Sequence, residues 1–289
     1  MSCNTGSGEC APAFASGSYD STQTSATGFP YLQPTYRLDD LEGQAAAIHR
    51  DGYALVPGVL SAEECKALRD AIDRLRPFGF DHMSPLQEHY KCVFNRERAF
   101  FEIIDRPGIV DLAEATMGEQ CHIIGVTAWR SHPGYNGWGP HTDQIWIEVP
   151  ESAFDDPAYQ LPVYVCTAHY YLNDIPTEEY CPTFVIPGSH RSGRGMRPEE
   201  VADPVWKGQR LEPVLVKAGD AMFFRSEIWH SGSKNASDQT RYLLQVHYSH
   251  RFISQKFSPW PFQFNPEILA IANPRQLRLL GKHPESNYG

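Results

Sequence analysis

The first part of the chain carries apolar residues with a helical period. Ser61 and Glu64 have the spacing of a capping box, and apolar residues then recur every three or four positions as far as Pro77. This stretch predicts an amphipathic helix that packs one face on the rest of the fold. Shorter helices are expected on either side of it, over residues 38–50, 97–104 and 108–117.

Strand patterns replace the helical ones from Cys121 onward, after one early strand. The later runs are short, rich in β-branched and aromatic residues, and separated by turn formers. Helices followed by many strands with long loops predict a mainly β fold, a helix-buttressed β-sandwich that a jelly roll would close without leaving edges. The strands are expected over residues 53–56, 122–130, 161–172, 183–186, 213–216, 221–225 and 241–250, and around His141.

The N-terminal segment, residues 1–35, differs in composition from the rest of the chain. It is rich in Ser, Thr, Gly and Ala and lacks periodic apolar residues, so it is expected to be disordered or loosely ordered. A lid over an active site is the less favoured alternative. Residues 36–289 contain no linker-like stretch and no internal repeat, and they are expected to form a single domain.

Composition narrows the class of protein. The chain has 289 residues, of which 41% are hydrophobic, and a formal net charge of −10, which argues against nucleic acid or a membrane as a partner. No apolar run approaches the roughly 18 residues that a transmembrane helix needs, and the N-terminus lacks a signal-peptide pattern. Seven Cys without a Cys-x-x-Cys pair indicate reduced thiols. A cytoplasmic location is therefore expected.

One His-x-Asp pair has the context of a metal site. Turn formers precede His141, and β-favouring residues follow as far as Val149, so His141 and Asp143 are expected to share one face of a strand. Two imidazoles and a carboxylate on one face of an octahedral ion suit Fe(II), because three positions stay open for a co-substrate and O₂. A second pair, His49 and Asp51, ends a helical pattern, where residues two apart do not face each other, and is interpreted as a surface helix end.

The remaining candidates for this site lie far downstream. His230 follows a predicted strand, and Arg241 begins another strand eleven positions later, which predicts that the two strands are antiparallel neighbours. The forked guanidinium of Arg241 suits bidentate binding of a co-substrate carboxylate. The predicted iron ligands are therefore His141, Asp143 and His230, with Arg241 beside them.

Two further motifs, residues 51–61 and 185–190, complete a pattern that resembles a known family. The chain resembles the phytanoyl-CoA dioxygenase (PhyH-like) family of Fe(II)/2-oxoglutarate oxygenases over roughly residues 40–285. The resemblance implies a double-stranded β-helix (jelly-roll, cupin-like) core with Fe(II), and with 2-oxoglutarate and O₂ as co-substrates. Two departures stand out. Tyr180-Cys181 replaces a frequent Asn-Gly, and Leu243 stands where many members have a hydroxyl that helps to hold the 2-oxoglutarate carboxylate.

The resemblance also implies an activity, namely oxidation of a C–H bond in a small molecule. Family members that halogenate have a small residue at the position of Asp143, so hydroxylation is the default, while desaturation, epoxidation and rearrangement stay open. Family membership and the acidic balance of the chain favour an uncharged or cationic natural-product intermediate of secondary metabolism, or an amino-acid derivative, over an acyl-CoA as substrate. The protein is expected to be a monomer or homodimer. The resemblance places Tyr170 towards the 2-oxoglutarate pocket. The alternatives are a non-enzymatic β-sandwich ligand-binding protein and a zinc hydrolase with the same ligands.

Several residues are weaker candidates for the substrate pocket. Gln245 and His247 share a strand face with Arg241, and an inward row of polar residues is costly unless it faces a cavity. Trp146 follows the metal motif and is a candidate wall of the same pocket. His190 ends a Pro-Gly-Ser-His turn and is interpreted as structural, because a fourth protein ligand would close a position that O₂ chemistry needs.

Overall fold

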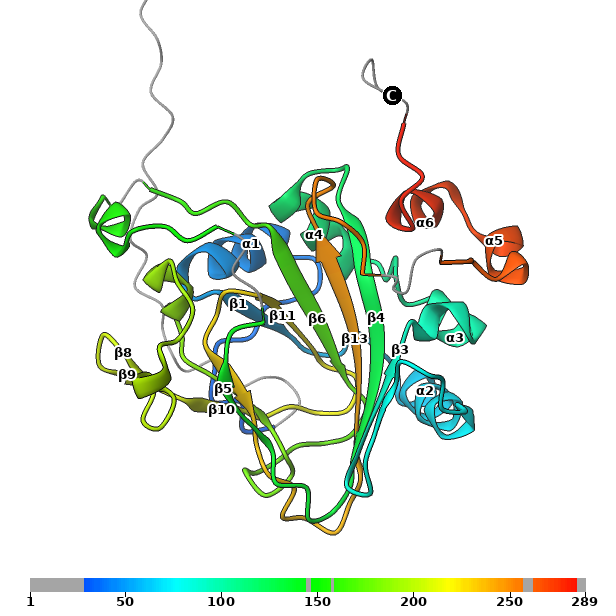
Figure 1. Ribbon diagram of the computed structural model, residues 1–289, viewed down its shortest axis with the longest axis horizontal. Coiled ribbons are helices and arrows are strands. Elements are labelled where there is room, and N and C mark those ends of the chain that lie inside the picture. The colour runs from blue at the N-terminus through cyan, green and yellow to red at the C-terminus, as the bar shows by residue number, and fades with distance from the viewer. Residues whose placement is uncertain (1–28, 144–146, 157–158, 257–261, 285–289) are drawn as a thin grey trace, which may run out of the picture.

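The structure is a computed structural model that describes residues 29–143, 147–156, 159–256 and 262–284. Two antiparallel sheets form its centre (Figure 1). The larger has the strand order β1 (Tyr53–Val56), β11 (Ala221–Arg225), β6 (Val165–Tyr171), β13 (Arg241–Ser249), β4 (His122–Ser131), β3 (Gln87–Lys91) and β2 (His82–Met83). The smaller has the order β10 (Glu212–Val214), β7 (Thr183–Val185), β12 (His230–Gly232) and β5 (Trp138–His141). A separate hairpin joins β8 (Val205–Trp206) to β9 (Gln209–Arg210).

Helices cover the outer face of the seven-stranded sheet (Figure 1). Alternate residues of its strands, such as Val56, Tyr170 and Val246, are buried in one large cluster with the apolar faces of these helices. The helices are α1 (Leu41–Arg50), α2 (Ala62–Arg74), α3 (Arg98–Phe101), α4 (Ile109–Met117), α5 (Pro266–Ile271) and α6 (Pro274–Leu279). Short 3-10 turns are η1 (Val93–Asn95), η2 (Glu151–Asp155), η3 (Ser189–Ser192) and η4 (Pro198–Glu200).

The capping box at the start of α2 has the expected form. Ser61 Oγ accepts from the backbone N–H of Glu64 (3.2 Å), and the Glu64 carboxylate accepts from the Ser61 N–H (2.7 Å). Cys65, Leu68 and Ile72 are buried on one face of α2. The sequence pattern therefore predicted this helix and its orientation.

The inner faces of the two sheets meet in a second apolar cluster. Leu55, Phe224 and Leu243 of the larger sheet pack in it with Val185 and Val214 of the smaller sheet. This cluster fills one end of the sandwich and leaves the other end hollow. The mainly β, jelly-roll-like architecture with helical buttresses is confirmed.

Three expectations about secondary structure need correction. The strand that contains His141 ends there, and residues 142–143 follow in an irregular bend. The helix expected over 97–104 is only the single turn α3. Strand β3 falls where no strand was expected, and it forms one wall of the hollow.

The last residues of the N-terminal segment pack on the core. Tyr31 donates its hydroxyl to Asp220 Oδ2 (2.8 Å), and Gln33 Nε2 donates to Pro213 O (3.0 Å). Thr35 pairs with Leu55 in a parallel bridge at the edge of β1. Ordered structure therefore begins earlier than residue 36, whereas residues 1–28 lie outside the described part. Among the described residues, no helix is long and apolar enough to cross a membrane.

Candidate metal centre and active-site cavity

A cavity of about 900 Å³ occupies the hollow between the two sheets. The smaller sheet contributes His141, Thr183 and His230, and Asp143 follows from the bend after β5. The larger sheet contributes a mostly polar wall, made by Gln87, His89, Lys91, Thr127, Trp129, His169, Arg241, Leu243, Gln245 and His247. A small molecule can therefore lie between the metal-binding motif and a polar sheet face.

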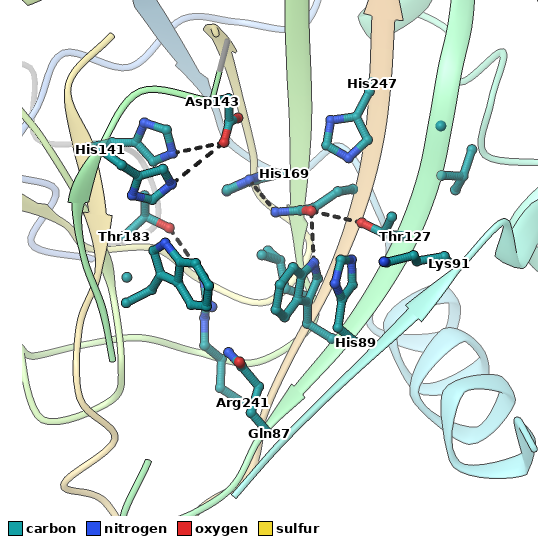
Figure 2. A pocket seen from close by; sticks show the side chains of 18 of the residues that line it. Gln87, His89, Lys91, Thr127, His141, Asp143, His169, Thr183, Arg241 and His247 are labelled. Carbon is teal, nitrogen blue, oxygen red and sulfur yellow. Dashed lines mark hydrogen bonds and ion pairs between the residues drawn. The ribbon is translucent and has the colours of Figure 1, made fainter. Parts of the chain in front are cut away.

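Three side chains converge at one end of this cavity. His141 ends β5 and lies directly opposite His230, the first residue of β12. The Asp143 N–H donates to Ser226 O (3.1 Å), which fixes the bend. The Nε2 atoms of His141 and His230 lie 3.6 and 3.5 Å from Asp143 Oδ1, and one donor atom from each residue lies within 4.8 Å of the others (Figure 2). Backbone pairing thus brings together residues that are 89 positions apart, from 141 to 230.

The two imidazoles are oriented by backbone carbonyls. His141 Nδ1 lies 2.8 Å from Gly139 O, and His230 Nδ1 lies 3.0 Å from Ile228 O. A carbonyl only accepts, so each Nδ1 must carry the proton and each Nε2 is left to bind an ion. This outer arrangement is the usual support of a metal-bound histidine. The donor set therefore fits a divalent cation such as Fe(II).

The electrostatics of the triad favour a cation at the same point. Burial alone would raise the pKa of the Asp143 carboxyl, but the charge of His230 and the contacts with the His141 and His230 rings hold that pKa well below its usual range. Burial opposes the charged form of His230, and Asp143 outweighs it and raises the pKa of His230. The carboxylate thus draws positive charge to the triad.

Arg241 faces this triad from the opposite sheet. The sequence suggested that its strand neighbours the strand of His230, and that expectation is wrong, because β13 pairs with β4 and β6 while β12 pairs with β5 and β7. Arg241 Nη2 donates to Thr183 Oγ1 (3.2 Å), and its guanidinium carbon lies 5.7 Å from the ring centre of Tyr171. Its Nε is buried without a hydrogen-bond partner. The guanidinium is therefore anchored at one nitrogen and keeps donors for an anion.

Thr183 supplies a hydroxyl beside Arg241, at a place in the cavity where Leu243 cannot. Leu243 is 3% exposed and packs in the inner apolar cluster, so it offers nothing to a carboxylate. Thr183 on the facing sheet accepts from both Arg241 and the Tyr171 hydroxyl, the latter at 3.1 Å. Its own hydroxyl proton is then free to point at a ligand beside Arg241.

A hydrogen-bond network crosses the wall of the larger sheet. Gln245 Oε1 accepts from Trp129 Nε1 and from Thr127 Oγ1, each at 2.8 Å. The amide nitrogen of Gln245 lies 2.7 Å from His169 Nε2 (Figure 2). Burial and the charge of Arg241 lower the pKa of His169 well below its usual value, so the ring is neutral. His169 lines the cavity, and its Nδ1 is buried without a hydrogen-bond partner.

Two residues predicted from the sequence to lie at the site, Tyr170 and Trp146, are not among the described residues that line the cavity. Tyr170 does not reach the cavity. It is fully buried on the other face of β6, under the helices, and its neighbour His169 faces the cavity instead. Trp146 lies outside the described residues. Gln245 and His247 line the cavity, as their spacing from Arg241 suggested, and His247 Nδ1 lies 2.9 Å from Thr167 Oγ1.

His190, His49 and Asp51, which were expected to be structural, do not line the cavity. His190 is 2% exposed, and its Nε2 lies 3.1 Å from the backbone O of His49. Asp51 is the C-cap of α1 and pairs with Arg50. These contacts give His190, His49 and Asp51 roles in joining a turn to a helix end.

Comparisons with known proteins agree with this architecture. The family model described as phytanoyl-CoA dioxygenase (PhyH) matches residues 48–243. A protein named dioxygenase af480, from Aspergillus fumigatus, is 24% identical over 259 residues, which are 83% of this chain and 77% of that protein. Methylphosphonate hydroxylase from Gimesia maris is 24% identical over 221 residues, which are 70% of this chain and 77% of that protein.

Solved structures show the same fold. The non-heme alpha-ketoglutarate-dependent epimerase SnoN from nogalamycin biosynthesis has a TM-score of 0.56 and 25% identity, covering 73% of this chain and 83% of SnoN. HygX from Streptomyces hygroscopicus, crystallised with nickel and 2-oxoglutarate, has a TM-score of 0.60 and 15% identity, covering 74% of this chain and 88% of HygX.

Proposed function

The chain belongs to the phytanoyl-CoA dioxygenase (PhyH) family, and from this premise we propose that it is an Fe(II)- and 2-oxoglutarate-dependent oxygenase of a small molecule. The proposed reaction oxidises a C–H bond, with hydroxylation as the default. One observation carries the proposal: two oriented imidazole Nε2 atoms and a carboxylate oxygen converge opposite a guanidinium with an unpartnered buried nitrogen.

His141, Asp143 and His230 are the proposed ligands of the iron. When bound there, Fe(II) supplies the redox chemistry that couples decarboxylation of 2-oxoglutarate to oxidation of the substrate by O₂. Two imidazoles and one carboxylate leave three positions of an octahedral ion open. Because Asp143 occupies the carboxylate position, no place is left there for a halide, and hydroxylation is favoured over halogenation.

The far side of the cavity is proposed to bind 2-oxoglutarate. Arg241 binds the distal carboxylate, and Thr183 holds the guanidinium and donates its hydroxyl proton to the same carboxylate. His169, whose ring is neutral and held by Gln245, lines the cavity as part of its wall. The inner apolar cluster around Leu243 closes this end against water, which strengthens each of these charged contacts.

The names of two similar proteins describe two different reactions. They include a hydroxylase of methylphosphonate and an epimerase of nogalamycin biosynthesis, so the family fold serves both oxygen insertion and stereochemical inversion in those proteins. For this chain, the proposal is oxidation of a small molecule that enters between the triad and the wall formed by β3 and β4.

The decisive experiment is optical. Purified protein is loaded with Fe(II) without oxygen, and 2-oxoglutarate is added while the visible spectrum is recorded. A metal-to-ligand charge-transfer band that saturates at one equivalent of iron supports the proposal, and admission of O₂ should then release succinate. Protein that holds iron yet develops no band would favour the zinc hydrolase or the ligand-binding protein. The His141→Ala variant is the matched control and should develop no band.

A further inference from the structure

The charges around the cavity do not balance once the proposed cofactors are bound. Among the described residues that line it, the charged side chains are Lys91, Asp143, Arg241 and Lys256. On the proposed function, Fe(II) contributes +2, Asp143 −1, 2-oxoglutarate −2 and Arg241 +1, which sum to zero. The ammonium groups of Lys91 and Lys256 then remain, a surplus of two positive charges in a chain whose net charge is −10.

Neighbouring imidazoles do not alter this balance. Burial is the main reason that the pKa of His89 falls to about 3 and that of His247 to about 4. Both rings are therefore neutral near pH 7. The two lysines are the groups whose charge an additional ligand can neutralise.

Lys91 is directed into the cavity by its strand. Gln87, His89 and Lys91 alternate on β3 and all line the cavity, and Lys91 lies opposite Thr127 of β4. Figure 2 shows its side chain beside Thr127 and His89, on the side of the cavity away from His141. Among the described residues, no carboxylate within ion-pairing distance holds its ammonium group.

The carboxylate that contacts the backbone of Lys91 is already paired with another side chain. Asp81 accepts the backbone N–H of Lys91 (2.8 Å), but its carboxylate is paired with Arg96, whose Nη1 and Nη2 lie 2.9 and 2.7 Å from the two oxygens. Asp81 therefore fixes the main chain at Lys91 and leaves the side chain to the cavity. A lysine placed in this way is suited to bind an anion.

Lys256 approaches the same cavity from the segment after β13. Its backbone N–H donates to Ile124 O (2.9 Å), which attaches the segment to the start of β4. Burial lowers the pKa of the Lys256 ammonium, and Asp143 partly offsets this effect. Lys256 lines the cavity and its side chain is exposed, so an anion in the cavity can reach its ammonium group.

A flat wall lies beside Lys91. The ring of His89 stacks on Trp129, with centroids 3.5 Å apart and planes inclined by 10°. Trp129 is held in turn by Gln245, and His89 Nε2 is buried without a partner. The wall is therefore flat, and its histidine ring is neutral near pH 7.

We propose that the substrate of this site is an anion whose carboxylate, phosphonate or phenolate oxygens bind the ammonium groups of Lys91 and Lys256, with its carbon skeleton against His89 and Trp129. The inference rests on the proposed function, because the surplus charge is counted with iron and 2-oxoglutarate in place. It replaces the expectation of an uncharged or cationic substrate, which was based on the family resemblance and on the acidity of the whole chain. A local basic cavity in an acidic protein also concentrates an anion from solution.

The test compares anionic and neutral probes of one size. Protein saturated with Ni(II), as a redox-inert stand-in for iron, and with 2-oxoglutarate is titrated calorimetrically with phenylphosphonate, benzoate and benzyl alcohol. The two anions should bind at least about 10-fold more tightly than the alcohol, since one charged hydrogen bond contributes about 1.5–3 kcal/mol. The order of phenylphosphonate and benzoate distinguishes a phosphonate from a carboxylate substrate.

Substitutions of the two lysines test whether their ammonium groups bind the anions. Lys91→Met and Lys256→Met should each weaken binding of the anions by about 10-fold and leave benzyl alcohol within about twofold, because each removes one charged contact. Lys91→Arg, which keeps the charge, should restore part of the loss. Lys66→Met is the matched control, because Lys66 is exposed on α2 and pairs with Asp70, and it should change nothing. Raising the salt concentration should weaken the anions in wild-type protein, which tests the charge without any variant.

Three results would overturn the inference. The first is equal binding of the anions and the alcohol, and the second is unchanged anion binding in the Lys91→Met/Lys256→Met double variant. The third is displacement of 2-oxoglutarate by an anionic probe, because the anion would then bind Arg241 and not the lysines. The charge-transfer band of the Fe(II) protein separates this failure from failure of the proposed function. A normal band without anion preference refutes only the substrate class, whereas no band removes the charge balance and refutes both.

Discussion

Gln245 and His169 stand on neighbouring strands and are joined by a hydrogen bond that runs in one direction only. An indole nitrogen is an obligate donor, so the Trp129 contact identifies the acceptor oxygen of the Gln245 amide. The amide nitrogen must then donate to His169 Nε2, and the single proton of the neutral imidazole is on Nδ1. Trp129, which is not part of the triad, thereby determines which nitrogen of His169 carries the proton.

The Gln245→Glu substitution should raise the pKa of His169. The carboxylate keeps an acceptor for Trp129, but its second oxygen can only accept, which favours a proton on His169 Nε2. A carboxylate at this distance raises a histidine pKa by about 1–3 units. Nitrogen NMR of labelled histidine in metal-free protein measures the change, and Gln245→Met, which adds no charge, is the control. Identical titrations of the Glu and Met variants would refute the assigned direction.

Each of the three proposed ligands should be required for iron. In His141→Ala, Asp143→Ala and His230→Ala, Fe(II) should bind more than about 10-fold more weakly, because even loss of an outer partner of a ligand weakens metal binding by about 10- to 100-fold. The fold should persist in the first two variants, since His141 and Asp143 expose 31% and 33% of their side chains. Iron content after gel filtration is the readout, with His49→Ala as control. An Asp143→Ala protein that retains full iron would exclude Asp143 as a ligand.

Arg241→Lys should raise the KM for 2-oxoglutarate by roughly 10- to 150-fold, because the fork is lost while the charge is kept. Thr183→Val should raise it by roughly 2- to 10-fold, through loss of one neutral hydroxyl. Iron affinity should not change in either variant. Succinate formation at varied 2-oxoglutarate gives both constants, and an unchanged KM in Arg241→Lys would remove the arginine from the co-substrate site.

Acid should destabilise the protein through buried neutral histidines. Burial lowers the pKa of His190 to about 3, whereas an unfolded histidine titrates near 6.5. Between these values the unfolded chain binds one more proton than the folded one, so stability falls as pH falls below about 6.5. His190→Gln should therefore flatten the dependence by about 1.4 kcal/mol per pH unit. Urea unfolding of metal-free protein from pH 7 to 4.5 measures this slope, and equal slopes would contradict the assignment.

The N-terminal segment should divide into two parts by its effect on stability. A protein that begins at Phe29 should melt at the same temperature as the full chain. One that begins at Arg37 loses the hydrogen bonds of Tyr31 and Gln33, and with them the bridge to β1. Its melting temperature should drop by roughly 5–10 °C. Equal melting temperatures of the two shortened proteins would mean that residues 29–36 contribute nothing to the core.

Periodic patterns predicted the elements with one apolar face. The capping box at Ser61, the strand Tyr53–Val56 and the alternation of β13 are local signals, and each occurs in the structure as expected. The triad followed from ligand chemistry and motif order. Its three donors do converge, although Asp143 lies beyond the strand end and not on the strand.

The missed elements are those whose sequence is shaped by the cavity or by an edge. Strand β3 contains Gln87, His89 and Lys91 because these side chains line a polar cavity, so its sequence resembles a loop. Strand β5 contains Gly139 and Pro140, and it tolerates them because it pairs on one side only. In β6 the choice between His169 and Tyr170 depended on the phase of a strand that is buried on both faces, where alternation is invisible. The separation of Arg241 and His230 into different sheets is a long-range property that no local pattern reports.

The proposed co-substrate site spans both layers of the sandwich, since the triad belongs to the four-stranded sheet and Arg241 to the seven-stranded one. A dicarboxylate bound to both would act as a tie between the layers, and its release would require them to part slightly. We therefore expect amide hydrogens in β12 and β13 to exchange with deuterium more slowly when 2-oxoglutarate is bound. The dwell time of the co-substrate would then depend on how tightly Phe224 and Val185 pack between the sheets, at a distance from either charge.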